Sequence, residues 1–409
     1  MKVIANYLPQ YHEIPENTRW WGKGFTDWQA VRRAVPLFAG HQEPRVPLDK
    51  RYYDLSDVEA IRWQAELAQR YGVYGWGIYH YWFSSDMMLL QRPAELIRDH
   101  ADIPIHYMFI WDNSSWVRTW SSKRLANDWA PSYDQSQGEH QGSGVLAELV
   151  YGTEADWKKH FDYLLTFFRD DRYIKVAGRP MFAIFQPHND FQTIQRMVMY
   201  WNQLAKEAGF PGLLCLTKTN WCHEELPDKI CYSPNAPGKF WSAAVNSLRM
   251  RIAKKFNRIY FRDYDAVWRE VLSESRDADN RMYLSGFVDF DDSPRRGGRH
   301  AFCAAARRRS SAGIWSSCYA SRRHTARSTP SSRLGTSGAR AHTLSQTLGT
   351  ATHGWRLSSR PLCGSTRNNA SWYEIFSEAL HCLTLVSYNV SCVCTLDSSV
   401  SFEREEQAA

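Results

Sequence analysis

The chain has 409 residues, of which 44% are hydrophobic and 23% are charged, and its formal net charge is +7. These values indicate a globular protein with either two or three domains or one large α/β barrel. The sequence contains no run of eighteen apolar residues and no charged-then-apolar leader. We therefore expect no membrane span, no secretion, and a cytoplasmic protein with reduced cysteines.

The net charge is distributed unevenly along the chain. Residues 1–292 hold 37 acidic and 35 basic residues, whereas residues 293–409 hold 6 acidic residues and 15 arginines. The 81 residues between Asp292 and Glu374 contain 14 Arg but no Asp, Glu or Lys, although folded domains normally carry charges of both signs. The sequence therefore predicts two parts, residues 1–300 and residues 301–409, and only the first has the composition of a folded domain.

Hydrophobic periodicity in the first part alternates between strand and helix. In chain order, strands are expected at residues 3–8, 74–81, 104–111, 181–185, 213–216, 229–232 and 284–289. Helices are expected around residues 58–68, 93–100, 157–168, 194–204 and 267–272. This alternation predicts a parallel α/β fold, and no glycine-rich phosphate-binding motif follows any strand. A (β/α)8 barrel is therefore favoured over a nucleotide-binding fold.

The expected C-terminal ends of the strands combine aromatic and polar residues, and in (β/α)8 barrels these ends carry the active site. Aromatic rings beside hydrogen-bonding groups suit sugars, because the C–H faces of a sugar stack on aromatic rings. The candidate sugar-contact residues are Tyr11, His12, Trp21, His80, Tyr81, Trp82, Trp111, Asn113, Trp116 and Arg118. Ordinary packing at the barrel mouth is the alternative interpretation of each residue.

Two carboxylates, Asp112 and Asp291, are the candidate catalytic groups, because glycosyl chemistry through an oxocarbenium-like state uses carboxylates. A salt bridge to Arg295 or Arg296 is the alternative interpretation of Asp291. The sequence shows no metal-ligand spacing, so we expect no metal and no cofactor.

Several sequence blocks in the first part match a known protein family. They lie at residues 7–17, 19–28, 44–49, 52–55, 71–83, 173–180 and 291–297. The most specific are Tyr-Leu-Pro-Gln-Tyr-His at residues 7–12 and Arg-Trp-Trp-Gly-Lys-Gly-Phe-Thr-Asp-Trp at residues 19–28. Over residues 1 to about 300 the chain resembles WbsX-like proteins. These are called glycosyltransferases of lipopolysaccharide or O-antigen synthesis and are also described as glycoside hydrolase family 99-like. The resemblance implies a (β/α)8 barrel that acts on a glycan or a sugar nucleotide.

The chain departs from this family where catalytic acids are expected. The family motif at the third strand is usually Trp-Ala-Asn-Glu-Asn-Trp, whereas this chain has Ser114 in place of the Glu and an acid two residues earlier, Asp112. Related proteins should carry Asn-Glu-Trp-x-Glu-Gly near the eighth strand, and its two Glu are the catalytic pair of family 99 glycosidases. This motif is absent from the sequence, so the chain as written is expected to lack the pair and to be inactive.

A shift in reading frame accounts for the missing motif. Back-translation of residues 334–341 with permitted codons, read from the third base, gives Trp-Asn-Glu-Trp-Gly-Glu-Gly. We hypothesise a one-nucleotide shift or a misplaced exon edge near Ala301–Ala304, which would remove the seventh helix, the eighth strand and the eighth helix. The barrel would then be incomplete with two unpaired edges, and residues 303–370 would be mostly disordered.

Three functions remain open from the sequence. The first is glycosyl transfer or glycoside cleavage in polysaccharide or lipopolysaccharide metabolism. The second is glycan binding by a catalytically inactive barrel. The third is nucleic-acid binding through the arginine-rich tail, which could alternatively contact an anionic membrane. The nearly neutral charge of residues 1–292 favours the first two.

Overall fold

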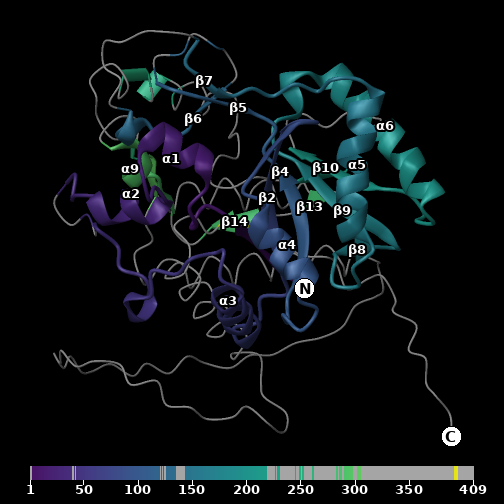
Figure 1. The fold of residues 1–409 in the computed structure, drawn as a ribbon, viewed down its shortest axis with the longest axis horizontal. Helices are drawn as coiled ribbons and strands as arrows, with labels where there is room; N and C mark the ends of the chain where they lie inside the picture. Colours follow the sequence, from purple (N-terminus) through teal and green to yellow (C-terminus); the bar gives the residue numbers. More distant parts are fainter. Residues whose placement is uncertain are drawn as a thin grey trace, which may run out of the picture.

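The computed structural model shows a mainly parallel β-sheet with helices packed around it (Figure 1). It describes residues 2–38, 41, 43–119, 121, 123, 126–134, 143–218, 226, 228–230, 245, 248–249, 251–252, 260–261, 282–283, 285–287, 290–297, 302–304 and 391–394. The predicted helix at 267–272 lies outside the described residues. So does the predicted disordered segment 303–370, apart from its first two residues.

Seven neighbouring strands of the main sheet run parallel. The first six correspond to strands expected from the sequence, but the seventh does not, because the strand expected at residues 284–289 is β14 (Ser285–Phe287) at the other end of the strand order. They are β1 (Val3–Tyr7), β2 (Gly75–Ser84), β4 (His106–Trp111), β9 (Arg179–Ile184), β10 (Leu214–Lys218), β11 (Lys229–Ile230) and β13 (Met282–Tyr283). Each neighbouring pair in the order β1-β2-β4-β9-β10-β11-β13 is parallel. The prediction of a parallel α/β fold is therefore confirmed.

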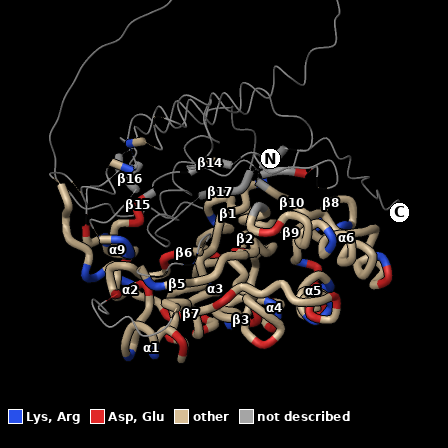
Figure 2. The backbone as a smooth tube through the Cα atoms, turned by 90° about the horizontal axis from the view of Figure 1, so that it is seen from above, with Lys and Arg blue, Asp and Glu red and all other residues tan. Residues whose placement is uncertain are grey.

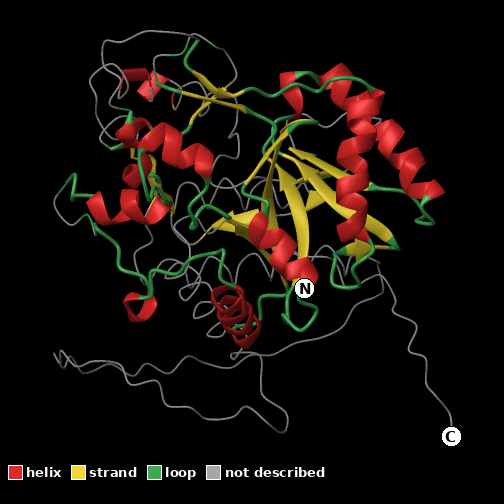
Figure 3. Cartoon of the chain, in the orientation of Figure 1, coloured by secondary structure: helices red, strands yellow, loops and turns green. Residues whose placement is uncertain are grey.

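Helices follow the strands at the positions that the periodicity predicted (Figure 3). They are α3 (Val58–Arg70), α4 (Arg92–Asp99), α5 (Glu154–Phe168) and α6 (Phe191–Glu207). Capping residues determine where two of them begin, because they satisfy backbone N–H groups that have no partner within the helix. Asp57 accepts a hydrogen bond from the Glu59 backbone at the start of α3, and Thr153 and Asp156 form a capping box at the start of α5.

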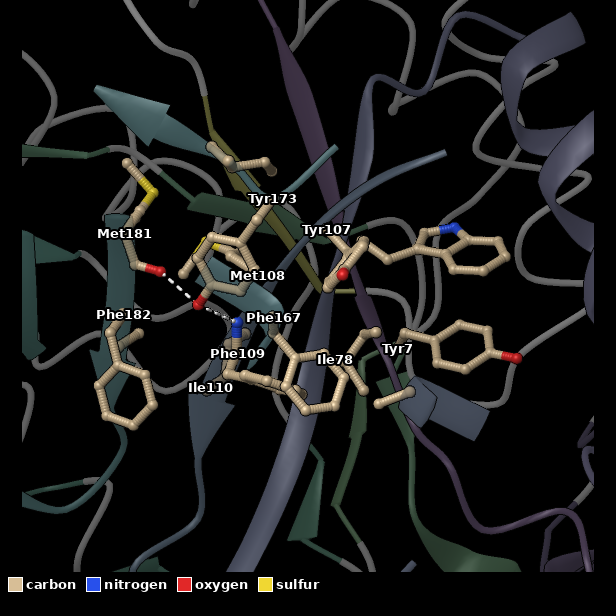
Figure 4. Packing of buried hydrophobic residues seen from close by; sticks show 14 of the residues in the cluster. Tyr7, Ile78, Tyr107, Met108, Phe109, Ile110, Phe167, Tyr173, Met181 and Phe182 are labelled. Atoms are coloured by element: carbon tan, nitrogen blue, oxygen red, sulfur yellow. Dashed lines mark hydrogen bonds between the residues drawn. The ribbon is translucent and has the colours of Figure 1, made fainter. Parts of the chain in front are cut away.

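The main core lies between the sheet and these helices (Figure 4). Phe109 of β4 packs against Phe167 of α5 with ring centroids 4.9 Å apart. The buried hydroxyl of Tyr173 accepts a hydrogen bond from the Phe109 backbone N–H at 3.2 Å and donates to the Met181 carbonyl at 2.9 Å. This hydroxyl therefore satisfies backbone groups of two neighbouring strands while its ring fills the core.

A second, smaller layer lies beyond the C-terminal ends of β2 and β4. It contains the three-stranded sheet of β5 (Ser115–Val117), β6 (Ala126–Asp128) and β7 (Val145–Ala147), and two short helices, α1 (Pro15–Trp21) and α2 (Asp27–Arg33). An aromatic-rich core of its own joins this layer to the end of β2. The sequence patterns predicted neither the small sheet nor the two short helices.

The C-terminal tail contributes a strand to the main sheet. Strand β17 (Ser391–Cys394) pairs antiparallel with β1 on one side and with β14 (Ser285–Phe287) on the other. The expectation that β1 would be left with an unpaired edge is therefore wrong, because a strand of opposite direction occupies that edge. One residue separates β13 from β14, so the two ends of the strand order come from adjacent sequence. Closure into a (β/α)8 barrel stays a prediction.

The remaining elements are short. They are β3 (Met87–Leu89), β8 (Lys175–Val176), β12 (Tyr260–Phe261), β15 (Phe290–Asp291), β16 (Phe302–Ala304), α9 (Ser293–Arg296) and the 3-10 turns Leu48–Lys50, Pro131–Tyr133 and Pro187–Asn189. Acidic and basic residues are interspersed along the described part of the chain (Figure 2). Among the described helices, none has the length and apolar character needed to cross a bilayer.

Candidate glycan site

A chain of polar side chains connects the C-terminal ends of β4 and β9. The Ser114 hydroxyl donates a hydrogen bond to Oδ1 of Asp112 at 2.6 Å, and Nε2 of Gln186 donates to the Ser114 hydroxyl at 2.8 Å. Ser114, where the resemblance noted above implies a Glu, contacts the acid that lies two residues earlier. The Ser114 hydroxyl and the Asp112 carboxylate therefore lie in direct contact at the end of β4.

Asn113 joins the ends of β4 and β9 through hydrogen bonds. Its Oδ1 accepts a hydrogen bond from the Gln186 backbone N–H at 2.7 Å, and its Nδ2 donates to the Gln186 carbonyl at 2.8 Å. Its backbone carbonyl accepts from Nδ2 of Asn189 at 2.6 Å. Because both amide atoms bind backbone groups, Asn113 acts as a positioning residue for the loop after β9 in this structure.

Tyr81 lies beside Asp112 at the end of β2 and is almost completely buried. Burial raises the pKa of the Tyr81 hydroxyl well above its usual value of 10, and the neighbouring Asp112 carboxylate raises it further, while Arg295 and Gln10 act in the opposite direction. Tyr81 therefore keeps its proton at neutral pH and can act as a hydrogen-bond donor. A protonated phenol and a carboxylate side by side suit a ligand that carries hydroxyl groups.

His80, Trp82 and Trp111, which were candidate sugar contacts, pack between the sheet and the helices. Nε2 of His80 lies 2.8 Å from Nε2 of His160 on α5. The Trp82 ring stacks on His160 with centroids 4.2 Å apart, and the Trp111 ring lies 6.1 Å from that of Trp201 on α6. Side chains alternate between the two faces of a strand, so His80 and Trp82 point away from the side that Tyr81 faces. The structure does not bring these three residues to the site.

Tyr11 and His12, which follow β1, lie in different surroundings. The Tyr11 ring packs against Trp28 and Tyr53, with centroids 4.6 Å and 5.4 Å away. His12 is 3% exposed, and neither of its ring nitrogens has a hydrogen-bond partner among the described residues. Burial lowers the pKa of His12, which keeps the imidazole neutral with one donor and one acceptor.

Trp21, Trp116 and Arg118 belong to the aromatic layer above the strand ends. Trp116 stacks on Trp129 with ring centroids 3.7 Å apart, and it forms a T-shaped pair with Tyr81 whose centroids are 5.0 Å apart. The Arg118 guanidinium lies 4.9 Å from the centre of the Trp21 ring. The indole N–H groups of all three tryptophans have no acceptor among the described residues. Sequence reasoning missed Trp129, because it lies after a loop rather than at a main-sheet strand end.

Asp291 is held in a network that differs from both expected salt bridges. Its Oδ2 accepts a hydrogen bond from Nε2 of His41 at 2.7 Å, and its Oδ1 accepts from the Ser293 backbone N–H at 2.9 Å. Burial opposes ionisation, but the His41 and Ser293 hydrogen bonds prevail and lower the pKa of Asp291. Asp291 is therefore a carboxylate at neutral pH and is unsuited to act as a general acid.

The two arginines near Asp291 pair with other acids. Arg295 donates two hydrogen bonds to the Asp27 carboxylate on α2, and Arg296 donates to Asp292 at 2.7 Å. The interpretation of Asp291 as a partner of Arg295 or Arg296 is therefore wrong. The Arg295–Asp27 pair fixes α9 against α2 and places Arg295 next to Tyr81, whereas the Arg296–Asp292 pair is local to α9.

A narrow cleft runs between the end of β1, α2 and α9. It encloses about 280 Å³, its opening to solvent included. The residues that line it are Leu8, Tyr11, Asp27, Ala30, Val31, Asp291, Asp292, Pro294 and Arg295. Asp291 and Tyr11, both candidate site residues, therefore face one cleft.

His41, Glu43 and Asp291 offer ligand atoms within 4.8 Å of one another, which is close enough to hold a metal ion. Sequence reasoning missed this group because Asp291 is 250 residues away in the chain from His41. Nδ1 of His41 accepts a hydrogen bond from the Leu37 backbone N–H at 3.1 Å, so the imidazole proton belongs on Nε2, where Asp291 accepts it. A metal on Nε2 would move that proton to Nδ1, against the Leu37 N–H. The geometry therefore fits a His–Asp hydrogen bond better than a metal centre.

Comparison with solved structures aligns parts of this chain with two structures of one enzyme. The GH99 endo-alpha-mannosidase from Bacteroides thetaiotaomicron aligns with 78% of this chain and 80% of its own, at 13% identity and a TM-score of 0.40. A structure of that enzyme with bis-tris-propane covers 64% of this chain and 68% of its own, at 15% identity and a TM-score of 0.31.

Comparison of sequences finds closer relatives. Two proteins described as "Uncharacterized protein WxcX" come from Xanthomonas campestris pv. campestris. That of strain B100 is 29% identical over 303 residues, and that of strain ATCC 33913 is 36% identical over 207 residues. These alignments cover 73% and 51% of this chain but 40% and 27% of the relatives, so the chain spans less than half the length of the curated relatives it matches. A family model described as "Glycosyltransferase WbsX" matches residues 3–326. The chain therefore belongs to the WbsX glycosyltransferase family, a family of carbohydrate-active proteins.

Proposed function

We propose that this chain binds a glycan at the C-terminal ends of β2, β4 and β9 and takes part in glycosyl transfer or glycoside cleavage in polysaccharide or lipopolysaccharide metabolism. Membership of the WbsX family supports a carbohydrate substrate. The observation that carries the proposal is the polar chain from Gln186 through Ser114 to Asp112, next to the protonated hydroxyl of Tyr81.

These groups match what a sugar ring presents. The Asp112 carboxylate accepts hydrogen bonds from sugar hydroxyls, and the Tyr81 hydroxyl donates to sugar oxygens. The buried rings of Trp116 and Trp129 pack beside Tyr81 and bring their indole N–H groups close to it. A ligand in this position would supply the acceptors that those N–H groups lack among the described residues.

Glycan binding without turnover is the second candidate function. Glycosidases that use two carboxylates hold them roughly 5–10 Å apart, one of them as an acid in at least one step. Here the family Glu is replaced by Ser114, and Asp291 is kept ionised by His41 and Ser293. These features favour a site that retains recognition but has lost part of its chemistry.

Three assays on the full-length chain separate the candidates. Consumption of a sugar nucleotide would support transfer, release of reducing ends would support cleavage, and glycan binding without either would support the second candidate. We expect Asp112→Asn to abolish turnover or weaken binding, whereas Asp162→Asn on the exposed face of α5 should change neither. The absence of any glycan binding by the wild-type chain would contradict both.

A further inference from the structure

An apolar stripe lies exposed among the helical residues between positions 245 and 252. Val245, Leu248 and Ile252 are 47%, 58% and 50% exposed. They are spaced by three and four residues, the spacing at which side chains share one face of a helix. The four other large apolar side chains with comparable exposure among the described residues are scattered singly, at Val35, Val46, Val150 and Met199. A group of three so close together indicates an interaction surface.

Basic residues accompany this stripe. Arg249 and Arg251 are exposed within it. The sequence from residue 229 to residue 262 contains eight Lys or Arg and no Asp or Glu. This charge is independent of the arginine-rich tail and lies within the segment that matches the WbsX family. The surface therefore combines three exposed apolar side chains with two exposed arginines, in a stretch of sequence without acidic residues.

The combination of exposed aliphatic and basic side chains favours an anionic membrane over a nucleic acid as the partner. Nucleic acids are bound largely through phosphate contacts from basic and polar groups, which leaves no role for three exposed aliphatic side chains. An amphipathic surface with Arg or Lys on its polar side and aliphatic residues on its apolar side fits the headgroup region of an anionic bilayer. We propose that the surface formed by Val245, Leu248, Arg249, Arg251 and Ile252 docks the protein onto an anionic membrane. The proposal concerns peripheral contact and does not depend on the glycan site.

The test is sedimentation of the full-length chain with vesicles of phosphatidylcholine and phosphatidylglycerol, compared with vesicles of phosphatidylcholine alone. We expect binding to the anionic vesicles that weakens as salt is raised. The Arg249→Gln/Arg251→Gln variant should bind about thirtyfold more weakly, from the usual contribution of one basic residue near an anionic surface. The Val245→Ser/Leu248→Ser/Ile252→Ser variant should lose on the order of a hundredfold.

A matched control removes equally exposed apolar side chains from other places. Val35→Ser/Val150→Ser/Met199→Ser should leave vesicle binding unchanged, and circular dichroism should show the same fold for every variant. Equal binding by the stripe variant and this control would overturn the proposal. Binding to RNA but not to vesicles, or a concentration-dependent dimer that the stripe variant abolishes without any vesicle binding, would also overturn it.

Discussion

The buried pair of His80 and His160 gives the sharpest test of which side of β2 faces the site. Their Nε2 atoms lie 2.8 Å apart, so one imidazole donates to the other while both stay neutral. Burial lowers the pKa of His80 to about 3 and that of His160 well below its usual value. Trp82 stacks on His160 at 4.2 Å, and no carboxylate contributes to either shift. The pair is a structural element of the core.

The sign of the pH effect follows from these lowered pKa values. The unfolded chain takes up a proton on each histidine near pH 6.5, whereas the folded chain does not do so until the pH is far lower. The stability that neutral imidazoles provide is therefore complete above about pH 6.5 and is lost as the pH falls below it. For His80 alone, lowering the pH from about 7 to about 5 should reduce the free energy of unfolding by about 2 kcal/mol.

Substitution of the pair separates burial from hydrogen bonding. His80→Phe or His160→Phe alone leaves one buried imidazole nitrogen without its partner, at a cost of about 1–3 kcal/mol. The double variant removes both polar groups, so it should cost less than the sum of the two single changes and should lose most of the pH dependence. Urea unfolding followed by tryptophan fluorescence at the two pH values measures both effects.

Glycan binding by the same variants shows whether His80 contacts the glycan or only supports the core. We expect the double variant to bind glycan as the wild type does, because both imidazoles lie between β2 and α5. A large loss of glycan affinity with unchanged stability would refute the reasoning and return His80 to the site. If the double variant lost as much stability as the sum of the two single variants, the direct hydrogen bond between His80 and His160 would be refuted.

Three further predictions address the long-range contacts and the tail. Asp27→Ala should lower the free energy of unfolding by about 2–4 kcal/mol in urea titrations, because Arg295 would lose its carboxylate partner in a largely buried place; an unchanged midpoint would contradict this. His41→Ala should destabilise the chain by about 1.5–3 kcal/mol and raise the pKa of Asp291, whereas His41→Gln, which keeps a donor, should do less. Equal destabilisation by His41→Ala and His41→Gln would show that the His41–Asp291 hydrogen bond contributes little to stability. Resequencing the gene and transcript across codons 298–345 should restore Asn-Glu-Trp-x-Glu-Gly in frame, and an intact single frame encoding the present tail would disprove the shift.

The parallel sheet could be predicted because each strand is a short apolar run between amphipathic helical segments. Apolar residues in α5 and α6 recur with a period of about 3.6 residues, and this spacing located both helices from the sequence alone. The short helices α1 and α2 could not be found in this way, since a helix of only seven residues is too short to show a clear apolar period. The pairing of β17 with β1 joins residues almost 400 positions apart, and no local pattern indicates it.

The candidate site was predicted in part, and the misplaced residues share one cause. Three consecutive residues, His80, Tyr81 and Trp82, were all predicted to contact the sugar, although alternate side chains on a strand face opposite sides. Tyr81 consequently faces Asp112, whereas His80 faces His160. The network around Asp291 depends on His41, which comes close only through the fold. A contact that spans 250 residues leaves no signal in one sequence.

We infer that glycans bind beside Asp112 at the C-terminal ends of the strands. Titration calorimetry with oligosaccharides from a lipopolysaccharide O-antigen measures this binding most directly, with the wild type, Asp112→Ala and the His80→Phe/His160→Phe control. We expect Asp112→Ala to weaken binding about tenfold or more, since it removes charge-assisted hydrogen bonds to sugar hydroxyls, while the His80→Phe/His160→Phe control binds normally. Equal affinity of Asp112→Ala and the wild type, or a loss confined to the control, would contradict this inference.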